Sequence, residues 1–111
     1  MKYLVIIPTY NEKDNIVQIV PAILKEYPHV HVLVVDDNSP DGTGGLVKEM
    51  AAQDQRIHLF ENPNKGGLGK AYLAGYKWGL SQGYEALVQM DADMIELAQA
   101  KQQRYIGGQS R

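Results

Sequence analysis

The sequence predicts an α/β fold: a doubly wound, mostly parallel sheet with helices on both faces. Short runs of apolar and β-branched residues alternate along the chain with segments in which apolar residues recur at helical spacing. The first run is apolar almost throughout, as in strands that are covered on both faces. Turn residues separate the runs, and the repeated strand–helix order indicates parallel strands joined by crossover helices.

The first strand is predicted over residues 3–10 (YLVIIPTY). Asn11 can cap the helix that follows, with Asp14 as its reciprocal partner. Apolar residues then recur at helical spacing, so this helix is predicted to be amphipathic. Pro21 lies within the pattern and is expected to kink the helix or restart it, and Pro28 is expected to end it.

Residues 29–37 (HVHVLVVDD) are predicted to form the second strand because they are dense in β-branched side chains. Turn residues follow at 38–43 (NSPDGT), and the apolar spacing over 46–51 predicts a short second helix. A third strand is predicted at 56–61 (RIHLFE). The histidines of these segments have no metal-ligand spacing, so we interpret them as ordinary strand residues.

A glycine-rich loop is expected at 62–69 (NPNKGGLG), followed by a helix from Lys70 to about Gln82 that Gly83 terminates. Small residues recur at every fourth position of this helix, which predicts a smooth face packed against the sheet. They are Ala71, Gly75 and Gly79. A fourth strand is predicted at 84–90 (YEALVQM).

The glycine-rich loop matches neither of the common nucleotide-binding glycine motifs. A Walker A loop would need a glycine where Asn64 stands and a serine or threonine where Ala71 stands. The dinucleotide fingerprint would need its third glycine at Tyr72. The loop therefore predicts neither kind of site.

The composition fits one domain spanning residues 1–111. Of these residues 44% are hydrophobic, which is enough for a core, and 11 basic against 13 acidic residues leave a net charge of −2. No basic stripe argues for nucleic acid, so none is expected as a partner. The absence of cysteine fits a reducing cytoplasm, and every apolar run is far shorter than the roughly 20 residues of a membrane-spanning helix. We therefore expect a cytoplasmic protein that is at most attached to a membrane surface.

Acidic residues gather where the predicted strands end. They are Glu12 after the first strand, Asp36 and Asp37 after the second, and Asp91 and Asp93 after the fourth. In open α/β sheets, ligands bind beyond the carboxyl ends of the strands. Taken singly, each acid has a structural alternative as a turn, helix-capping or first-turn residue. Together they repel one another unless a cation or a donor-rich ligand is bound, so the sequence predicts a metal–diphosphate site with oxygen ligands suited to Mg²⁺ or Mn²⁺.

Four segments together resemble the nucleotide-sugar-binding half of family 2 glycosyltransferases. They are VIIPTYNE (5–12), VLVVDDNSPDGT (32–43), NKGGLGKAYLAGYKWG (64–79) and VQMDAD (88–93). The likeness is greatest to the dolichol-phosphate or polyprenol-phosphate mannosyltransferase branch. It implies a Rossmann-like GT-A fold and an enzyme that moves a sugar from a nucleotide-diphospho-sugar, GDP-mannose by first preference, to a polyprenol or dolichol phosphate.

The resemblance also implies roles for residues at the first two strand ends. Pro8, Tyr10 and Glu12 would line the nucleotide. Val35 and Asp37 would bind the base and the ribose. A carboxylate suits this task because it can accept two hydrogen bonds from a ribose or from a base N–H edge.

Further roles fall on the end of the fourth strand and on the segment RYIGGQSR (104–111). Asp91, Ala92 and Asp93 would meet the ribose and diphosphate, with Asp93 the principal ligand of a Mg²⁺ or Mn²⁺ ion and Asp91 nearer the ribose. Arg104 would contact the donor and acceptor phosphates, so Asp93 and Arg104 are the implied catalytic residues. The alternatives are a helix cap for Asp93 and a solvated side chain for Arg104.

The sequence departs from the family pattern after Asp93, where a helix is predicted over 94–103. The family continues with a loop whose serine or glutamine helps to hold the metal, and Ile95 stands at that position instead. Before Arg104 the family has a strand rich in valine and isoleucine, where this sequence has AQAKQQ. We expect a longer protein whose intervening segments are absent from this sequence, in preference to a shortened domain.

Two other functions stay open at this point. One is a nucleotide-sugar-binding module without transferase activity, and the other is a family 2 glycosyltransferase that uses a UDP-sugar and a saccharide acceptor. A phospho-receiver domain is disfavoured, because its paired acids close the first strand, whereas Asp36 and Asp37 close the second. Asp36 and Asp41 are interpreted as structural or supporting residues.

Overall fold

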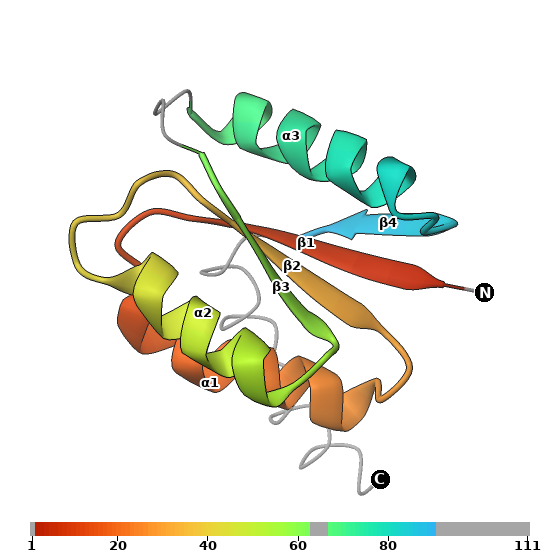
Figure 1. Cartoon of the computed structure of the whole chain (residues 1–111), viewed down its shortest axis with the longest axis horizontal. Helices are drawn as coiled ribbons and strands as arrows, with labels where there is room; N and C mark the ends of the chain where they lie inside the picture. The colour runs from red at the N-terminus through yellow and green to blue at the C-terminus, as the bar shows by residue number, and fades with distance from the viewer. Residues whose placement is uncertain (1, 63–66, 91–111) are drawn as a thin grey trace, which may run out of the picture.

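The computed structural model describes residues 2–62 and 67–90, which form a parallel sheet with helices on both faces (Figure 1). The strands are β1 (Tyr3–Thr9), β2 (His31–Asp36), β3 (Ile57–Glu61) and β4 (Ala86–Gln89), and the helices are α1 (Lys13–Glu26), α2 (Thr43–Gln53) and α3 (Gly67–Ser81). The strand order is β3-β2-β1-β4, so β1 lies between β2 and β4. Every neighbouring pair of these strands is parallel, which confirms the fold class predicted from the alternating pattern.

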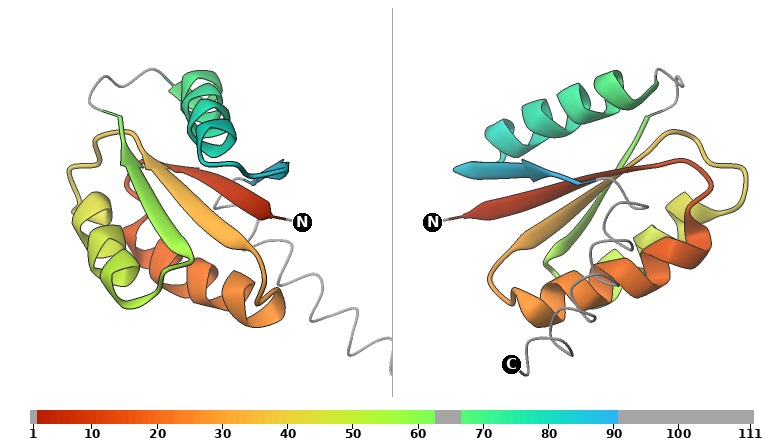
Figure 2. Two further views of the ribbon diagram at one scale, coloured as in Figure 1. Left: turned by 45° about the vertical axis from the view of Figure 1, so that its right-hand side comes forward. Right: turned by 180° about the vertical axis from the view of Figure 1, so that it is seen from behind.

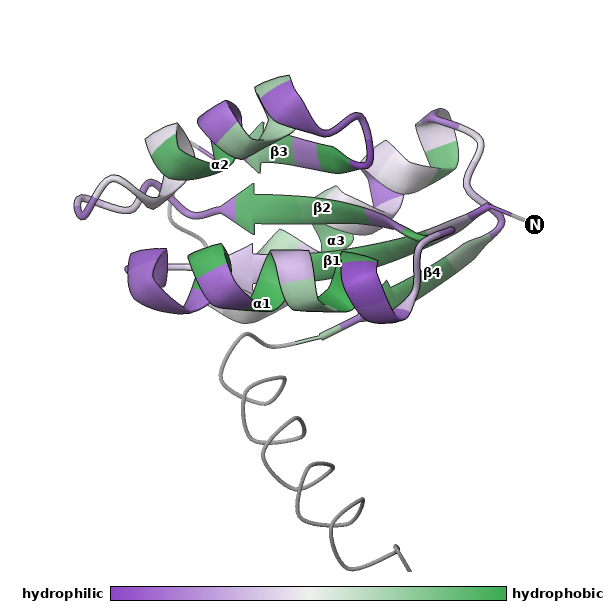
Figure 3. Cartoon of the chain, turned by 90° about the horizontal axis from the view of Figure 1, so that it is seen from below, coloured by the Kyte–Doolittle hydropathy of each residue, from purple (hydrophilic) through white to green (hydrophobic). Residues whose placement is uncertain are grey.

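The helices divide between the two faces of the sheet. α1 and α2 cover one face and α3 covers the other, as two further views show (Figure 2). Alternate residues of β2 therefore enter different cores: Val32 and Val34 pack with α1 and α2, whereas Leu33 and Val35 pack with α3. Burial on both faces explains why this strand is apolar at every position from Val32 to Val35, the middle of the strand, as Figure 3 shows by hydropathy.

Two glycines allow α3 to lie close to the sheet, as predicted from their spacing. A Cβ atom at Gly75 would come within 2.6 Å of Ile6 Cγ2, and one at Gly79 within 2.8 Å of Leu87 Cδ2. These distances are shorter than the optimal separation of two carbon atoms, about 3.5–4.0 Å. A larger side chain at either position would therefore push the helix away from the sheet.

Helix α1 differs from the prediction at its start and at its proline. Asn11 does not cap the helix: it has a φ of 55° and precedes the cap residue, Glu12, which makes no capping hydrogen bond through its side chain. Pro21 lies inside α1 without restarting it, since the helix is continuous from Lys13 to Glu26. The apolar face of α1 is buried on the sheet both before and after Pro21, and this packing outweighs the loss of one backbone donor.

The other elements lie close to their predicted positions. α3 begins at Gly67 instead of Lys70, because Gly67 takes the left-handed conformation (φ 83°) and the chain becomes helical directly after it. Gly83 has a φ of 84° just beyond α3, as predicted for the residue that ends this helix. The helix predicted over 94–103 lies outside the described residues. Within residues 2–62 and 67–90, no helix is both long enough and apolar enough to span a bilayer.

Candidate functional site

The carboxyl ends of the strands lie along one edge of the sheet, toward the left in Figure 1. The register places Thr9, the last residue of β1, opposite Asp36, the last residue of β2. Two loops leave this edge, residues 10–12 before α1 and residues 37–42 before α2. Both loops carry residues that are predicted to bind a ligand.

Asp36 is buried, and hydrogen bonds occupy both of its carboxylate oxygens. Oδ1 accepts from the Thr9 hydroxyl at 2.8 Å and from the Ser39 hydroxyl, and Oδ2 accepts from the Ser39 N–H at 3.0 Å. The residue is only 2% exposed, so water does not compete for these bonds. Asp36 therefore has the structural role predicted for it, which is to join the end of β1 to the loop after β2.

Asp37 is also buried, at 6% exposed, but its Oδ1 has no hydrogen-bond partner among the residues that the structure describes. Its backbone N–H donates to the carbonyl of Thr9 at 3.0 Å, which holds Asp37 beside the end of β1. An unsatisfied buried acceptor costs about 1–3 kcal/mol, and more when it is charged. Such an atom calls for a ligand, an ion or a water molecule to complete it. Asp37 is thus the strongest candidate for ligand binding in the described chain.

The loop of residues 10–12 presents two more of the predicted site residues at this edge. Tyr10 is 40% exposed. Glu12 is partly buried, and its Oε2 accepts a hydrogen bond from Asn15 Nδ2 at 2.8 Å. The carboxylate is thereby held at the start of α1, where the helix dipole favours negative charge.

Pro8 and Val35 are register partners on β1 and β2, and both are buried. Val35 is 0% exposed because its side chain packs against α3, beside Gly75. The predicted contact of Val35 with the base therefore cannot use its side chain, and only its backbone remains for that role. Strand alternation is the physical reason, since it turns Val35 toward the core on the α3 side.

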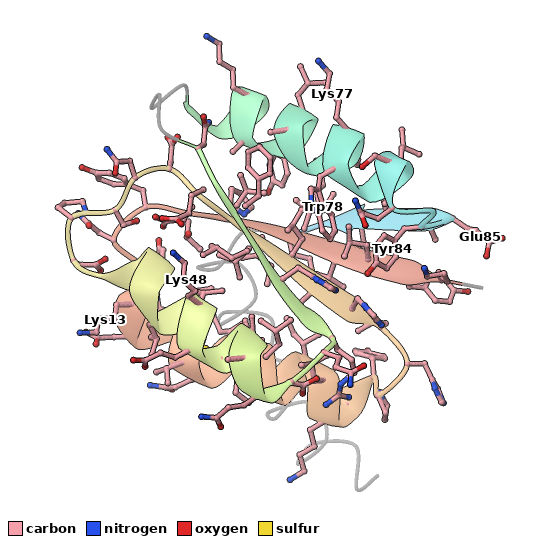
Figure 4. All side chains as sticks on the ribbon, viewed as in Figure 1. Lys13, Lys48, Lys77, Trp78, Tyr84 and Glu85 are labelled. Atoms are coloured by element: carbon pink, nitrogen blue, oxygen red, sulfur yellow. The ribbon has the colours of Figure 1, made fainter. Side chains whose placement is uncertain are left out.

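Asp41 connects the second loop to the start of α1. Its Oδ1 accepts from the N–H and the hydroxyl of Thr43, and its Oδ2 accepts from the Lys13 N–H at 3.3 Å. These hydrogen bonds, with that of the Thr43 hydroxyl the strongest, hold the pKa of Asp41 below its ordinary value. Figure 4 shows Lys13 at the beginning of α1, on the same side of the molecule as this loop. Asp41 is therefore structural, as predicted.

Four of the predicted site residues lie outside the described part of the chain, so their roles stay predictions. They are Asp91, Ala92, Asp93 and Arg104. β4 runs parallel to β1 toward this edge, and the Met90 N–H donates at 2.9 Å to the carbonyl of Ile6, which lies before the end of β1. Within residues 2–62 and 67–90, no three His, Cys, Asp or Glu side chains are grouped as a metal site. The predicted metal ligands, Asp93 and Asp91, both lie beyond Met90.

Thr9 and Ser39 support the site but were not singled out from the sequence. A serine that follows an aspartate by three residues is a common partner of its carboxylate in turns, so Ser39 could have been identified from its spacing. The bond from Thr9 to Asp36 could not, because it depends on the register of β1 against β2.

A groove of about 670 Å³ lies between β3 and α3, away from the two loops. Phe60, Leu73 and Trp78 are among its lining residues, and none of the lining residues comes from residues 10–12 or 37–42. The groove does not coincide with the unpaired oxygen of Asp37. The candidate site is therefore the carboxyl edge of the sheet and not this groove.

Residues 4–100 match the family model described as glycosyl transferase family 2. The chain belongs to this family. The match begins in β1 and includes both loops of the candidate site. The family and the GT-A type of fold that the sequence motifs implied are thereby confirmed.

Two curated relatives carry names from the polyprenol-phosphate mannosyltransferase branch. The polyprenol monophosphomannose synthase of Mycolicibacterium smegmatis is 57% identical over 91 residues, which cover 81% of this chain and 34% of the relative. The undecaprenyl-phosphate mannosyltransferase of Micrococcus luteus is 48% identical over 93 residues, which cover 84% of this chain and 38% of the relative. This glycosyl transferase family 2 chain thus spans little more than a third of the length of these relatives.

Two solved structures are also similar to this chain. The mannosyltransferase PcManGT from Pyrobaculum calidifontis, in complex with GDP-Man and Mn²⁺, has a TM-score of 0.70 at 30% identity, covering 82% of this chain and 27% of that one. S. aureus TarS 1-349 in complex with UDP has a TM-score of 0.68 at 27% identity, covering 84% of this chain and 28% of that one. The first of these proteins was solved with a sugar nucleotide and a divalent metal ion, and the second with a nucleotide.

Proposed function

We propose that this chain is the donor-binding part of a glycosyltransferase that moves mannose from GDP-mannose to a polyprenol phosphate. The observation that carries the proposal is the buried, unpaired Oδ1 of Asp37 at the carboxyl edge of the sheet. This is the edge at which open α/β sheets bind ligands. The names of the two curated relatives support the choice of mannose and of a polyprenol phosphate acceptor.

Asp37 has the chemistry required to hold a nucleoside. Its free oxygen can accept hydrogen bonds from ribose hydroxyls or from a base N–H edge. A hydrogen bond to a charged group contributes about 1.5–3 kcal/mol, and burial of Asp37 shields that bond from water. Tyr10 and Glu12 flank the same position from the neighbouring loop and would line the nucleotide.

A divalent metal ion is proposed at the same edge, held by residues beyond Met90. Mg²⁺ and Mn²⁺ prefer hard oxygen ligands such as the carboxylates of Asp91 and Asp93. We propose that Asp93 holds the ion, with Asp91 nearer the ribose. The ion would supply neutralisation of the charge on the departing diphosphate. Arg104 would donate a fork of N–H groups to the phosphates.

The proposed acceptor makes a dedicated general base unnecessary. A phosphate monoester is largely ionised near neutral pH, so its oxygen is already a nucleophile, unlike a sugar hydroxyl. Because the acceptor is a lipid, the protein would work at the cytoplasmic surface of a membrane. A UDP-sugar with a saccharide acceptor is the second candidate, which the similarity to TarS in complex with UDP favours.

Transfer from isotope-labelled GDP-mannose to a short polyprenyl phosphate, with Mn²⁺ present, tests the proposal in the full-length protein. We expect labelled lipid to form, and we expect Asp37→Asn to suppress it, because the amide loses the charge that strengthens the bond to the nucleotide. Glu49→Gln, at an exposed position of α2, is the matched control and should leave transfer unchanged. Binding of GDP without any transfer would contradict the enzyme proposal, and transfer from UDP-glucose in place of GDP-mannose would favour the second candidate.

A further inference from the structure

We propose that Ser39 is a positioning residue for the nucleotide site. Its hydroxyl joins the two loops that carry Glu12 and Asp37, and it thereby sets how these side chains stand relative to each other. The inference rests on the proposed function for the identity of the ligand. The hydrogen bonds of Ser39 that support it all join described residues.

The Ser39 hydroxyl both accepts and donates a hydrogen bond. Its oxygen accepts a hydrogen bond from the backbone N–H of Asn11 at 2.9 Å, and its proton goes to Asp36 Oδ1 at 2.5 Å. The Ser39 N–H donates to the other oxygen of Asp36 at 3.0 Å. Thr9 also donates to Asp36. The buried carboxylate at the end of β2 therefore connects the end of β1 to the turn that contains Ser39.

The two residues joined by this hydrogen bond, Asn11 and Ser39, both lie close in sequence to predicted ligand residues. Asn11 stands between Tyr10 and Glu12, and Asn38 separates Asp37 from Ser39. Both asparagines have left-handed backbones, with φ of 55° at Asn11 and 59° at Asn38. Left-handed residues other than glycine persist where surrounding contacts hold them. The Asn11–Ser39 bond is such a contact. Its loss should make the backbone at Asn11 more mobile, and the orientation of the next residue, Glu12, less well defined.

A second link between the loops is weaker than the first. The Lys13 N–H reaches Asp41 Oδ2 at 3.3 Å, which is longer than the 2.9 Å of the Asn11–Ser39 bond, and both hydrogen bonds lie at exposed positions. Hydrogen bonds weaken with length. Ser39 is therefore the side chain through which the first loop is held against the second.

The test compares GDP affinity by calorimetry in wild type and three variants. Ser39→Ala should weaken GDP binding about tenfold, the effect of losing one well-formed hydrogen bond. Ser39→Thr keeps the hydroxyl and should restore most of the affinity. Ser81→Ala is the matched control, since it removes a serine hydroxyl with local partners, the Trp78 carbonyl at 2.6 Å and Gln82 Nε2 at 3.5 Å, and it should have no effect on binding.

A double-mutant cycle separates positioning from a general loss of structure. If Ser39 acts by placing Asp37, then Ser39→Ala should have little further effect on GDP affinity when Asp37 is already alanine. Hydrogen exchange at the Asn11 amide, measured without nucleotide, should become faster in Ser39→Ala. Ser39→Cys, which replaces the hydroxyl by the weaker donor of a slightly larger thiol, takes the place of Ser39→Ala should the latter not fold.

Two different failures are distinguishable. Wild type that binds GDP, together with Ser39→Ala that binds it equally well despite faster exchange at Asn11, overturns the positioning role and leaves the proposed function intact. Wild type that does not bind GDP at all overturns the proposed function, and the positioning role with it. An effect of Ser39→Ala that simply adds to that of Asp37→Ala would also contradict the positioning role.

Discussion

At the scale of single residues, the two consecutive acids after β2 show how surroundings assign roles. Asp36 and Asp37 are both almost completely buried. Asp36 has a donor for each of its oxygens, whereas Asp37 keeps one oxygen unpaired within the described chain. Removal of Asp36 should therefore affect folding, and removal of Asp37 should affect binding.

Asp37→Ala should weaken GDP binding by roughly 1.5–3 kcal/mol, the contribution of a hydrogen bond to a charged group. Its free energy of unfolding should be unchanged or slightly higher, because the substitution removes an unsatisfied buried charge.

Asp36→Ala should lower the free energy of unfolding by about 1–3 kcal/mol, since it leaves the hydroxyl of Thr9 and the N–H of Ser39 without acceptors. Calorimetry and urea denaturation measure the two effects, and wild-type GDP affinity in Asp37→Ala would count against its role.

Two histidines meet at the opposite edge of the sheet and share a hydrogen bond. His31 Nδ1 and His58 Nε2 lie 3.0 Å apart, and the Tyr84 hydroxyl lies 2.7 Å from the first and 3.2 Å from the second. The two imidazole rings are stacked, with centroids 5.2 Å apart and ring planes that differ by 19°. Figure 4 labels Trp78 and Tyr84, which pack beside this pair. There is room for one proton between the nitrogens but not for two.

The environment of this pair favours neutral histidine. Burial is the main cause that lowers the pKa of both side chains below 6.5. Nearby positive charge lowers the pKa of each histidine further. At His58 it comes from His31 and then Lys2, and at His31 from Lys2 and Arg56, with Asp54 opposing it only at His31. A group whose pKa is lower in the folded state stabilises the fold above its unfolded pKa, and this stabilisation is lost as the pH falls.

The free energy of unfolding should therefore decrease as the pH is lowered from about 7 to 5, where histidine takes up its proton. His58→Gln, which can hydrogen bond but does not titrate, should flatten this dependence. His29→Gln is the control because His29 is exposed, and it should keep the wild-type slope. Urea denaturation across this pH range measures the slopes, and equal slopes in wild type and His58→Gln would show that the pair does not titrate with folding.

The role of Asp37 could be predicted from the sequence, whereas the contact between His31 and His58 could not. Asp37 could be picked out because it stands at a strand end in a pattern of acids. The pairing of His31 with His58 could not, because it depends on how β2 and β3 align and on Tyr84, which lies far along the chain. The histidines were interpreted as structural residues, and the structure agrees while adding the contact between them.

At the scale of elements, the helix α3 lies close to the sheet because two of its residues have no side chain. Gly75 and Gly79 present backbone to the sheet, so Ile6 and Leu87 can reach the helix axis more closely than a larger residue would permit. This packing was predictable, because the spacing of small residues along a helix is a local property. The first residue of α3 was not, since Gly67 enters the helix through a left-handed conformation that spacing does not reveal.

Gly79→Leu should lower the free energy of unfolding by roughly 1–3 kcal/mol through overpacking. The added side chain would collide with Leu87 and Leu4, whose methyl carbons lie 2.8 and 2.9 Å from the position of a Cβ atom. Gly45→Leu in α2 is the matched control, because a Cβ atom there has no neighbour within 4 Å among the described residues. Thermal denaturation compares the two, and equal melting temperatures would mean that α3 packs through another face.

At the scale of the whole molecule, the topology brings distant parts of the sequence to one edge. The strand order β3-β2-β1-β4 sets β4 next to β1, and Met90, directly after β4, bonds to Ile6 in the middle of β1. Alternation of strands and helices was enough to predict parallel strands and the edge at which the candidate site lies. The geometry of Asp93 and Arg104 lies beyond the described residues and stays a prediction.

Asp93→Asn should abolish the increase in GDP affinity caused by Mn²⁺ while leaving the fold intact. The carboxylate would be the main protein ligand of the ion, and an amide oxygen carries no charge to replace it. Calorimetry with Mn²⁺ and with EDTA gives the increase for each protein, and circular dichroism checks the fold. An equal increase in wild type and Asp93→Asn would reduce Asp93 to a helix cap.

The proposed function requires the nucleotide to bind at the carboxyl edge of the sheet. Titration of the isotope-labelled protein with GDP and Mg²⁺, followed in amide NMR spectra, locates the binding site because every described element reports at once. Residues of the two loops, Tyr10 to Glu12 and Asp37 to Asp41, should shift and saturate together, while His31 and Tyr84 at the opposite edge stay in place. Shifts confined to the groove between β3 and α3, or to the histidine edge, would contradict the claim.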